Sequence, residues 1–131
     1  MEKKTDARKT PKSLLVPPLE KDVQRHICDW LAEQKYFFWR QNNIPVFGVS
    51  NDGKKRFRAL PKYTPRGIPD ILVIHEGKLW GFEVKREGAP LRAEQADFGA
   101  GMIRHGAMWY VVHALSEVRD LLTFRPAPPA M

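Results

Sequence analysis

Two short runs of strand-forming, mostly apolar residues dominate the middle of this sequence: Ile71–His75 and Lys78–Val84, separated only by Glu76 and Gly77. A two-residue connection with glycine in second place is a strong signal of an antiparallel hairpin. Both faces of this hairpin carry apolar side chains, so both faces require a covering layer. The sequence therefore predicts an α/β sandwich with the hairpin near the centre of its sheet.

The register of the hairpin places two carboxylates side by side. If the turn lies at positions 76 and 77, Asp70 faces Glu83, and directly opposed residues hold their Cβ atoms about 4.5–5.5 Å apart. Two like charges repel at that distance, and a divalent cation bound between them would remove the repulsion. Lys85 lies two residues beyond Glu83, on the same face of the strand. This pattern is typical of a metal-dependent site that cleaves phosphodiester bonds; the alternative is an exposed strand end with a surface salt bridge.

A first helix is expected over Leu19–Gln34, where apolar residues recur at helical spacing. Glu20 falls within its apolar stripe, which is unusual for a carboxylate unless it is paired or belongs to a site. The alternative is an acid that complements the helix dipole in the first turn. We expect Glu20 to act as an outer acid of the site.

The second half of the sequence predicts a helix, a buried strand and a final helix. Pro90–Gly106 should form the helix, with Gln95 on its apolar stripe. Met108–Val112 should be a strand parallel to the preceding hairpin strand, because a helix connects the two. Ser116 is expected to cap the last helix. Three more strands are predicted between the first helix and the hairpin region, at Tyr36–Trp39, Val46–Val49 and Phe57–Leu60.

The composition favours one domain. The chain has 131 residues and one cysteine, which excludes an internal disulfide and a Cys-rich zinc site. We expect flexible tails at 1–18 and 125–131 and a folded domain at 19–124. No apolar run approaches the roughly 20 residues of a membrane span, so a cytoplasmic protein of a bacterial or phage-infected cell is expected.

Positive charge is concentrated in two segments. The net charge is +7, but outside residues 1–12 and 53–68 the remaining 11 basic and 13 acidic residues give −2. The second segment carries six basic residues and no acid, and leads directly to Asp70. A positive segment beside paired acids favours a polyanionic substrate, most commonly nucleic acid; a solvated basic loop is the alternative.

Five segments together resemble the standalone VRR-NUC (virus-type replication-repair nuclease) branch of the PD-(D/E)xK nuclease superfamily, over about residues 19–124. They are the helix with Glu20, Trp39-Arg40-Gln41-Asn42-Asn43, Gly67-Ile68-Pro69-Asp70, Gly81-Phe82-Glu83-Val84-Lys85 and the helix with Gln95. The resemblance implies an α/β/α sandwich around a central mixed β-sheet, with a restriction-endonuclease-like core. It also implies a homodimeric endonuclease that cuts branched DNA, such as four-way (Holliday) junctions, during repair or recombination.

The expected site follows from the residues and the resemblance together. Asp70 and Glu83 would bind Mg²⁺ or Mn²⁺, which prefer oxygen ligands, and the resemblance adds the Val84 carbonyl. Lys85 would orient water or offset phosphate charge, and Gln95 would position these groups. No small-molecule cofactor is expected. The candidate DNA contacts are Arg40, Asn42, Lys54, Lys55, Arg56, Arg58, Lys62 and Arg66.

Two other functions stay open at this stage. One is a sequence-specific or nonspecific nuclease of duplex DNA. The other is a noncatalytic DNA-binding module that uses only the basic segments, although the presence of Asp70, Glu83 and Lys85 argues against it.

Overall fold

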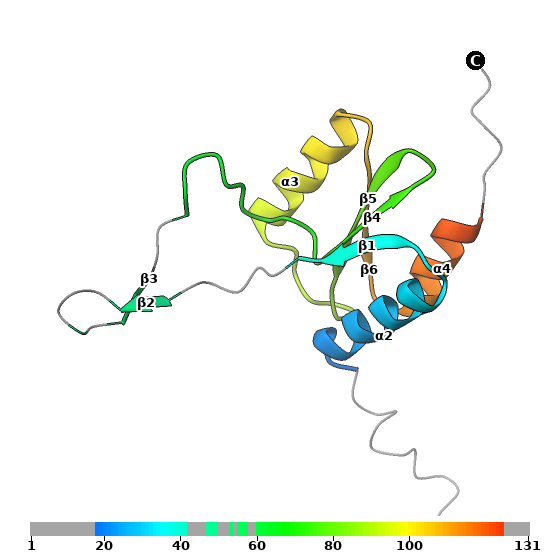
Figure 1. Ribbon diagram of the computed structural model, residues 1–131, viewed down its shortest axis with the longest axis horizontal. Coiled ribbons are helices and arrows are strands. Elements are labelled where there is room, and N and C mark those ends of the chain that lie inside the picture. The colour runs from blue at the N-terminus through cyan, green and yellow to red at the C-terminus, as the bar shows by residue number, and fades with distance from the viewer. Residues whose placement is uncertain (1–17, 42–46, 50–52, 54, 58–59, 125–131) are drawn as a thin grey trace, which may run out of the picture.

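The computed structural model describes residues 18–41, 47–49, 53, 55–57 and 60–124 (Figure 1). The predicted tails, apart from Pro18, lie outside these residues, so the domain boundaries stay a prediction. The helices are α2 (Glu20–Glu33), α3 (Ala93–Arg104) and α4 (Leu115–Thr123), and the strands are β1 (Phe37–Arg40), β2 (Phe47–Val49), β3 (Lys55–Phe57), β4 (Ile71–His75), β5 (Lys78–Val84) and β6 (Met108–Val112).

The predicted hairpin forms the centre of a four-stranded mixed sheet with the strand order β1-β4-β5-β6. In its antiparallel register Leu72 pairs with Gly81 and His75 pairs with Lys78, as predicted. Both turn residues have positive φ angles, 53° at Glu76 and 75° at Gly77, which suit the right-handed twist of the two strands. β6 returns parallel to β5 after the helical crossover. The α/β fold and its mixed sheet are therefore confirmed.

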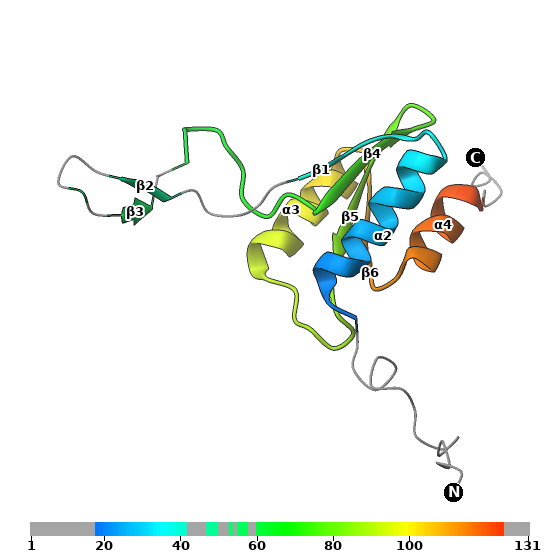
Figure 2. The same cartoon turned by 60° about the horizontal axis from the view of Figure 1, so that its bottom comes forward.

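Helices cover both faces of the sheet, α2 and α4 on one side and α3 on the other (Figure 2). The main core lies under α2 and α4, because the helical stripes meet the alternate strand residues that point to that side. Its fully buried members come from both helices and three strands: Val23, Ile27, Leu31, Ile71, Val73, Phe82, Val84, Val112, Val118 and Leu122. Every one of them is apolar, so burial of these side chains supplies the main stabilisation of the fold.

Helix α3 approaches the sheet closely at Gly99. A Cβ atom there would lie 2.2 Å from the Trp109 ring, so only glycine permits this contact. Gly101 has no such close neighbour, because a Cβ atom there would lie 3.9 Å from the nearest atom, on the side chain of Arg104. The helix begins at Ala93, later than the predicted Pro90, and ends before Gly106, whose φ of 91° suits a helix stop.

Two local predictions differ from the structure. The structure has a strand at Lys55–Phe57, which pairs with β2 in a separate two-stranded sheet, whereas positions 58 and 59 of the strand expected at Phe57–Leu60 lie outside the described residues. This pair lies away from the sandwich (Figure 1). Ser116 does not cap α4; the helix is capped through the side chain of Glu117, which accepts from the Ala114 N–H at 3.3 Å. A carboxylate three residues into a helix satisfies the same free N–H groups that a serine cap would.

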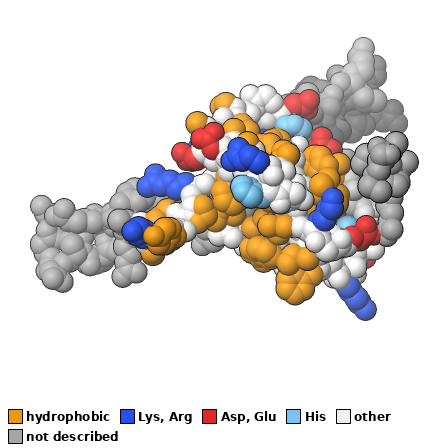
Figure 3. Space-filling model, turned by 90° about the horizontal axis from the view of Figure 1, so that it is seen from above, with side chains coloured by type: hydrophobic (Ala, Val, Ile, Leu, Met, Phe, Trp, Pro, Cys, Tyr) orange, Lys and Arg blue, Asp and Glu red, His pale blue; other side chains and the backbone are white. Residues whose placement is uncertain are grey.

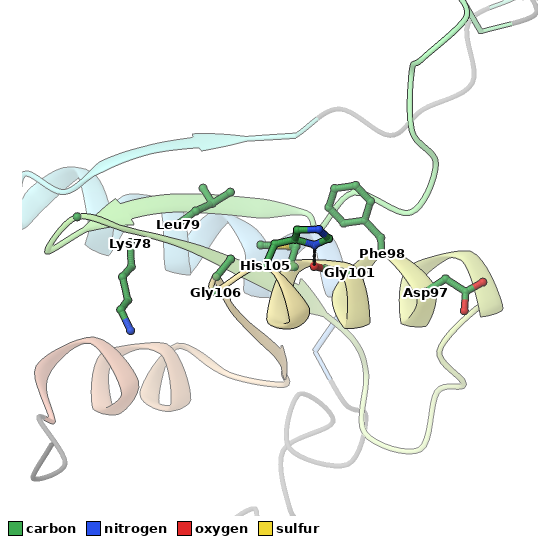
Figure 4. Close-up of a pocket in the computed structure, with 10 residues that line it drawn as sticks. Lys78, Leu79, Asp97, Phe98, Gly101, His105 and Gly106 are labelled. Atoms are coloured by element: carbon green, nitrogen blue, oxygen red, sulfur yellow. Dashed lines mark hydrogen bonds between the residues drawn. The ribbon is translucent and has the colours of Figure 1, made fainter. Parts of the chain in front are cut away.

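The α3 side of the sheet is covered only in part, contrary to the prediction of two buried faces. Phe37 is 69% exposed, Ile74 45% and Trp39 39%, because β1 and the turn end of β4 extend beyond α3. Trp39 lies on this surface. Apolar side chains also gather on the molecular face in Figure 3. Beside it, a cleft between the β4–β5 turn and α3 is lined by residues that include Leu79, Phe98, Met102 and His105 (Figure 4). No helix among the described residues is long and apolar enough to cross a membrane.

Candidate active site

The two predicted carboxylates meet where β4 begins and β5 ends. Asp70 directly precedes β4, and its Oδ2 accepts a hydrogen bond of 2.8 Å from the Val84 N–H. Glu83 is only 1% exposed, and its Oε1 accepts a hydrogen bond of 2.8 Å from Gln95 Nε2. The structure thus brings Asp70 and Glu83 together, as the register of the hairpin predicts, and adds Gln95 from α3.

Burial and neighbouring charges shift the pKa values of both acids. Burial raises the pKa of Glu83 to about 8, with the negative charge of Asp70 as the next cause. Burial also raises the pKa of Asp70, against the opposing effect of the Val84 hydrogen bond. For both acids the positive charge of Lys85 lowers the pKa and the negative charge of Glu20 raises it. Without a cation, the acid pair therefore retains a proton near neutral pH.

The second oxygen of Glu83 supports a cation at this position. Glu83 Oε2 is buried and accepts no hydrogen bond from an N–H or O–H group of the described residues, so without a cation the proton held between the Asp70 and Glu83 side chains is what offsets the cost of burying it. The described part of the chain contains no cluster of three or more His, Cys, Asp or Glu side chains that could hold a metal. Mg²⁺ is commonly bound by one or two carboxylates, with water and substrate phosphates as the other ligands. The acid pair fits such an ion, and the Val84 carbonyl stays a ligand expected from the resemblance alone.

The first turn of α3 orients Gln95. The Arg92 N–H donates a hydrogen bond of 3.0 Å to Gln95 Oε1, so the amide oxygen is already occupied. The NH₂ group therefore points to Glu83, and the amide links the helix terminus to the buried acid. This explains why a polar side chain lies on the apolar stripe of α3.

Glu20 contacts the backbone directly after Lys85, beyond the end of β5. Lys85 is half-buried, and its N–H donates to the Val112 carbonyl at 3.0 Å. Glu20 lies in the first turn of α2, and its Oε1 accepts a hydrogen bond of 3.1 Å from the Arg86 N–H. Glu20 thus reaches the site as predicted, but its hydrogen bond fixes backbone. Its role as an outer acid stays a prediction.

Sequence reasoning overlooked two residues that organise the cluster. His113 Nδ1 lies 2.8 Å from the Lys85 carbonyl oxygen, and no ligand spacing in the sequence pointed to it. Gly67 has a φ of 80°, and a Cβ there would lie 2.2 Å from the Glu94 carbonyl oxygen. The loop before Asp70 therefore lies directly on the first turn of α3, which carries Gln95. A glycine three residues before an acid was the only available signal.

Replacing Gly67 with alanine is expected to lower the free energy of unfolding by about 3 kcal/mol, as strain and overpacking add. Gly77→Ala is the matched control, because its φ is 75° but nothing lies within 4 Å of the added Cβ. It should cost only about 1 kcal/mol from backbone strain. Urea unfolding of both variants measures the difference. Equal losses would show that the Gly67 contact with α3 is unimportant.

The structure describes only some of the predicted DNA-contact residues. Arg40 is exposed, and its Nε donates to Gln24 Oε1 at 3.0 Å. Lys62 and Arg66 are exposed on the segment before Asp70. Among the described residues, no hydrogen bond or ion pair connects these three side chains to the acid cluster. Lys55 and Arg56 belong to β3, and three candidates lie outside the described residues: Asn42, Lys54 and Arg58.

Comparison with known proteins gives one informative likeness. No protein-family model matches the sequence, and no curated protein matches it significantly. A solved structure described as a VRR_NUC domain superposes with a TM-score of 0.52 at 23% sequence identity, covering 78% of this chain and 91% of that one. At this identity the likeness concerns the fold. The chain therefore has the fold of a VRR-NUC domain, in agreement with the motifs of its sequence.

Proposed function

We propose that this protein is a divalent-metal-dependent DNA nuclease that hydrolyses phosphodiester bonds. The observation that carries the proposal is the acid pair: Glu83 is 1% exposed beside Asp70, and its Oε2 has no partner among the described residues. Such an oxygen is a ligand prepared for a cation. The fold of a VRR_NUC domain structure supports the same conclusion.

Each residue of the cluster has a distinct task in this proposal. Asp70, Glu83 and the Val84 carbonyl would hold Mg²⁺ or Mn²⁺, and the bound ion would polarise the scissile phosphate and activate a water. Lys85 would orient the attacking water and offset the negative charge that develops on the phosphate oxygens. Gln95 keeps the Glu83 carboxyl in place through their hydrogen bond of 2.8 Å.

The basic residues outside the cluster would bind the DNA backbone. β3 carries Lys55 and Arg56, and Lys62 and Arg66 are exposed between β3 and the acid pair. This order along the chain would place positive charge beside the cleaved strand. Contacts of this kind give affinity that falls steeply with salt and carries little sequence information.

Replacing both Lys55 and Arg56 with glutamine tests the role of β3. We expect DNA affinity at low salt to fall about tenfold, and the salt dependence of binding to lose roughly two phosphate contacts. The cleavage rate at saturating protein should change little, because neither residue belongs to the acid cluster. Filter binding over a salt series measures this, with Lys21→Gln/Lys35→Gln in and after α2 as a charge-matched control. Equal effects of the two pairs would contradict a specific role for β3.

The finer function rests on the sequence resemblance. We propose that the protein acts as a homodimer on branched DNA, four-way junctions above all, because two sites related by two-fold symmetry suit paired cuts across a symmetric junction. Sedimentation velocity tests the dimer. A monomer at micromolar concentration, with or without junction DNA, would rule it out.

The decisive experiment compares labelled four-way junction, flap, single-stranded and linear duplex DNA, with Mn²⁺, Mg²⁺ or EDTA. Metal-dependent cuts confined to the junction support the full proposal. Equal cutting of linear duplex would leave a nuclease without structural specificity. Binding without cutting under every condition would overturn the nuclease proposal in favour of a binding module.

A further inference from the structure

The peptide group that follows Lys85 is held at both of its polar atoms. Its N–H, that of Arg86, donates to Glu20 Oε1 at 3.1 Å. Its carbonyl oxygen, that of Lys85, lies 2.8 Å from His113 Nδ1. The Lys85 N–H on the other side is bonded to the Val112 carbonyl at 3.0 Å. Rotation about both backbone bonds of Lys85 is thereby restricted, which fixes the direction in which its side chain leaves the strand.

The geometry of His113 is itself determined by α4. The backbone N–H groups of His113 and Ala114 both donate to Glu117 Oε2, the second at 3.3 Å. The start of the helix thus holds the backbone from which the imidazole projects. A carbonyl oxygen only accepts hydrogen bonds, so the contact requires a proton on Nδ1. The imidazole is therefore a donor aimed at the Lys85 carbonyl.

We propose that His113 is a positioning residue that orients Lys85 for catalysis through this peptide group. The inference rests on the proposed nuclease function and adds a residue that the acid cluster does not include. Lysine has a long, flexible side chain, so a fixed starting direction reduces the number of positions its ammonium group samples. The parallel β5–β6 pairing already supplies the structural link through the Lys85 N–H, which leaves the imidazole bond free for this orienting task.

Substitutions at His113 distinguish the effect of the hydrogen-bond donor's position from the effect of side-chain size. In His113→Asn the side-chain NH₂ group can occupy the place of Nδ1, whereas His113→Ala removes the donor. His113→Gln retains an amide but places it one bond further away. We expect kcat to fall about 10- to 100-fold in the alanine and glutamine variants, with KM changed less than about twofold and near-complete rescue by asparagine.

Two further measurements distinguish positioning from general loss of structure. His105→Ala is the matched control, because His105 Nδ1 makes an equivalent 2.8 Å bond to the Gly101 carbonyl at the far end of α3; it should leave kcat unchanged. In a Lys85→Ala background, His113→Ala should cause no further loss of kcat, because its effect passes through Lys85. A loss of the same size in both backgrounds, or equal kcat for the asparagine and glutamine variants, would overturn the proposal.

Hydrogen exchange tests the same contact without any cleavage. The Lys85 and Arg86 amides should exchange about fivefold faster in His113→Ala, roughly the effect of one net hydrogen bond, and His113→Asn should restore the slow exchange. If the wild-type protein cuts no DNA but these amides respond as expected, the nuclease proposal fails and the positioning of Lys85 stands. Unchanged exchange in His113→Ala would overturn the positioning of Lys85 even in an active nuclease.

Discussion

Glu83→Gln is expected to lower the rate of DNA cleavage at least about 10³-fold, on the order of 4 kcal/mol in activation free energy. Glutamine has nearly the same shape and can still accept the hydrogen bond from Gln95. It removes only the negative charge and the unpartnered carboxylate oxygen, the two features that suit a cation. Single-turnover cleavage of junction DNA in Mn²⁺ measures the rate, and fluorescence anisotropy in EDTA measures binding.

Glu83→Gln should abolish cleavage without weakening DNA binding. DNA binding should stay within about twofold of wild type, because the basic residues are unchanged. Glu87→Gln is the matched control, since Glu87 is an exposed acid on the loop just after Lys85, and it should cleave normally. Full activity of Glu83→Gln would remove the site assignment. Simultaneous loss of binding and folding would instead indicate a structural role for the acid.

The second large effect concerns stability without metal. The pKa of Glu83 is raised from its ordinary 4.5 to about 8 in the folded protein. An acid with a raised pKa favours the folded state while it is protonated, so this contribution is fully present below about pH 4.5 and is lost as pH rises through about 8. We expect the free energy of unfolding in EDTA to fall by about 4 kcal/mol over this range.

Metal should reverse this loss, because a cation takes the place of the proton between the two acids. At pH 8, Mg²⁺ or Mn²⁺ at 100 times its dissociation constant should stabilise the wild type by about 2.7 kcal/mol. Glu83→Gln should be more stable than wild type in EDTA at pH 8 and should gain little from metal. Thermal unfolding at pH 5 and pH 8, with and without metal, gives all these values. A wild type that metal does not stabilise at pH 8 would contradict a cation site at the acid pair.

The surroundings of the acid pair also explain its arrangement. Asp70 is held by the Val84 N–H and Glu83 by Gln95, so hydrogen bonds within the protein orient both carboxyl groups. One oxygen of Glu83 accepts no hydrogen bond from an N–H or O–H group of the described residues, and the proposed cation would offset the repulsion between the two acids. Burying two acids side by side lowers the stability of the fold, and such a cost is expected where residues serve a function.

The sequence alone determined the centre of the molecule. The turn at Glu76 and Gly77 specifies the pairing of β4 with β5, and that register places Asp70 beside Glu83 with no help from the rest of the chain. Local turn chemistry and the two-residue period of a strand were sufficient, because the residues involved are close in sequence. The apolar stripe of α2 was predictable for the same reason.

Only the tertiary structure decided what surrounds that centre. The bond between Glu20 and the Arg86 N–H joins residues 66 positions apart, and the bond between His113 and the Lys85 carbonyl joins residues 28 positions apart. The exposure of Trp39 was likewise settled by which elements cover the sheet. Side-chain periodicity shows which face of an element is apolar, but long-range packing decides which neighbour meets each polar group. For this reason the acid pair was predictable from the sequence, whereas the contacts that orient Lys85 were not.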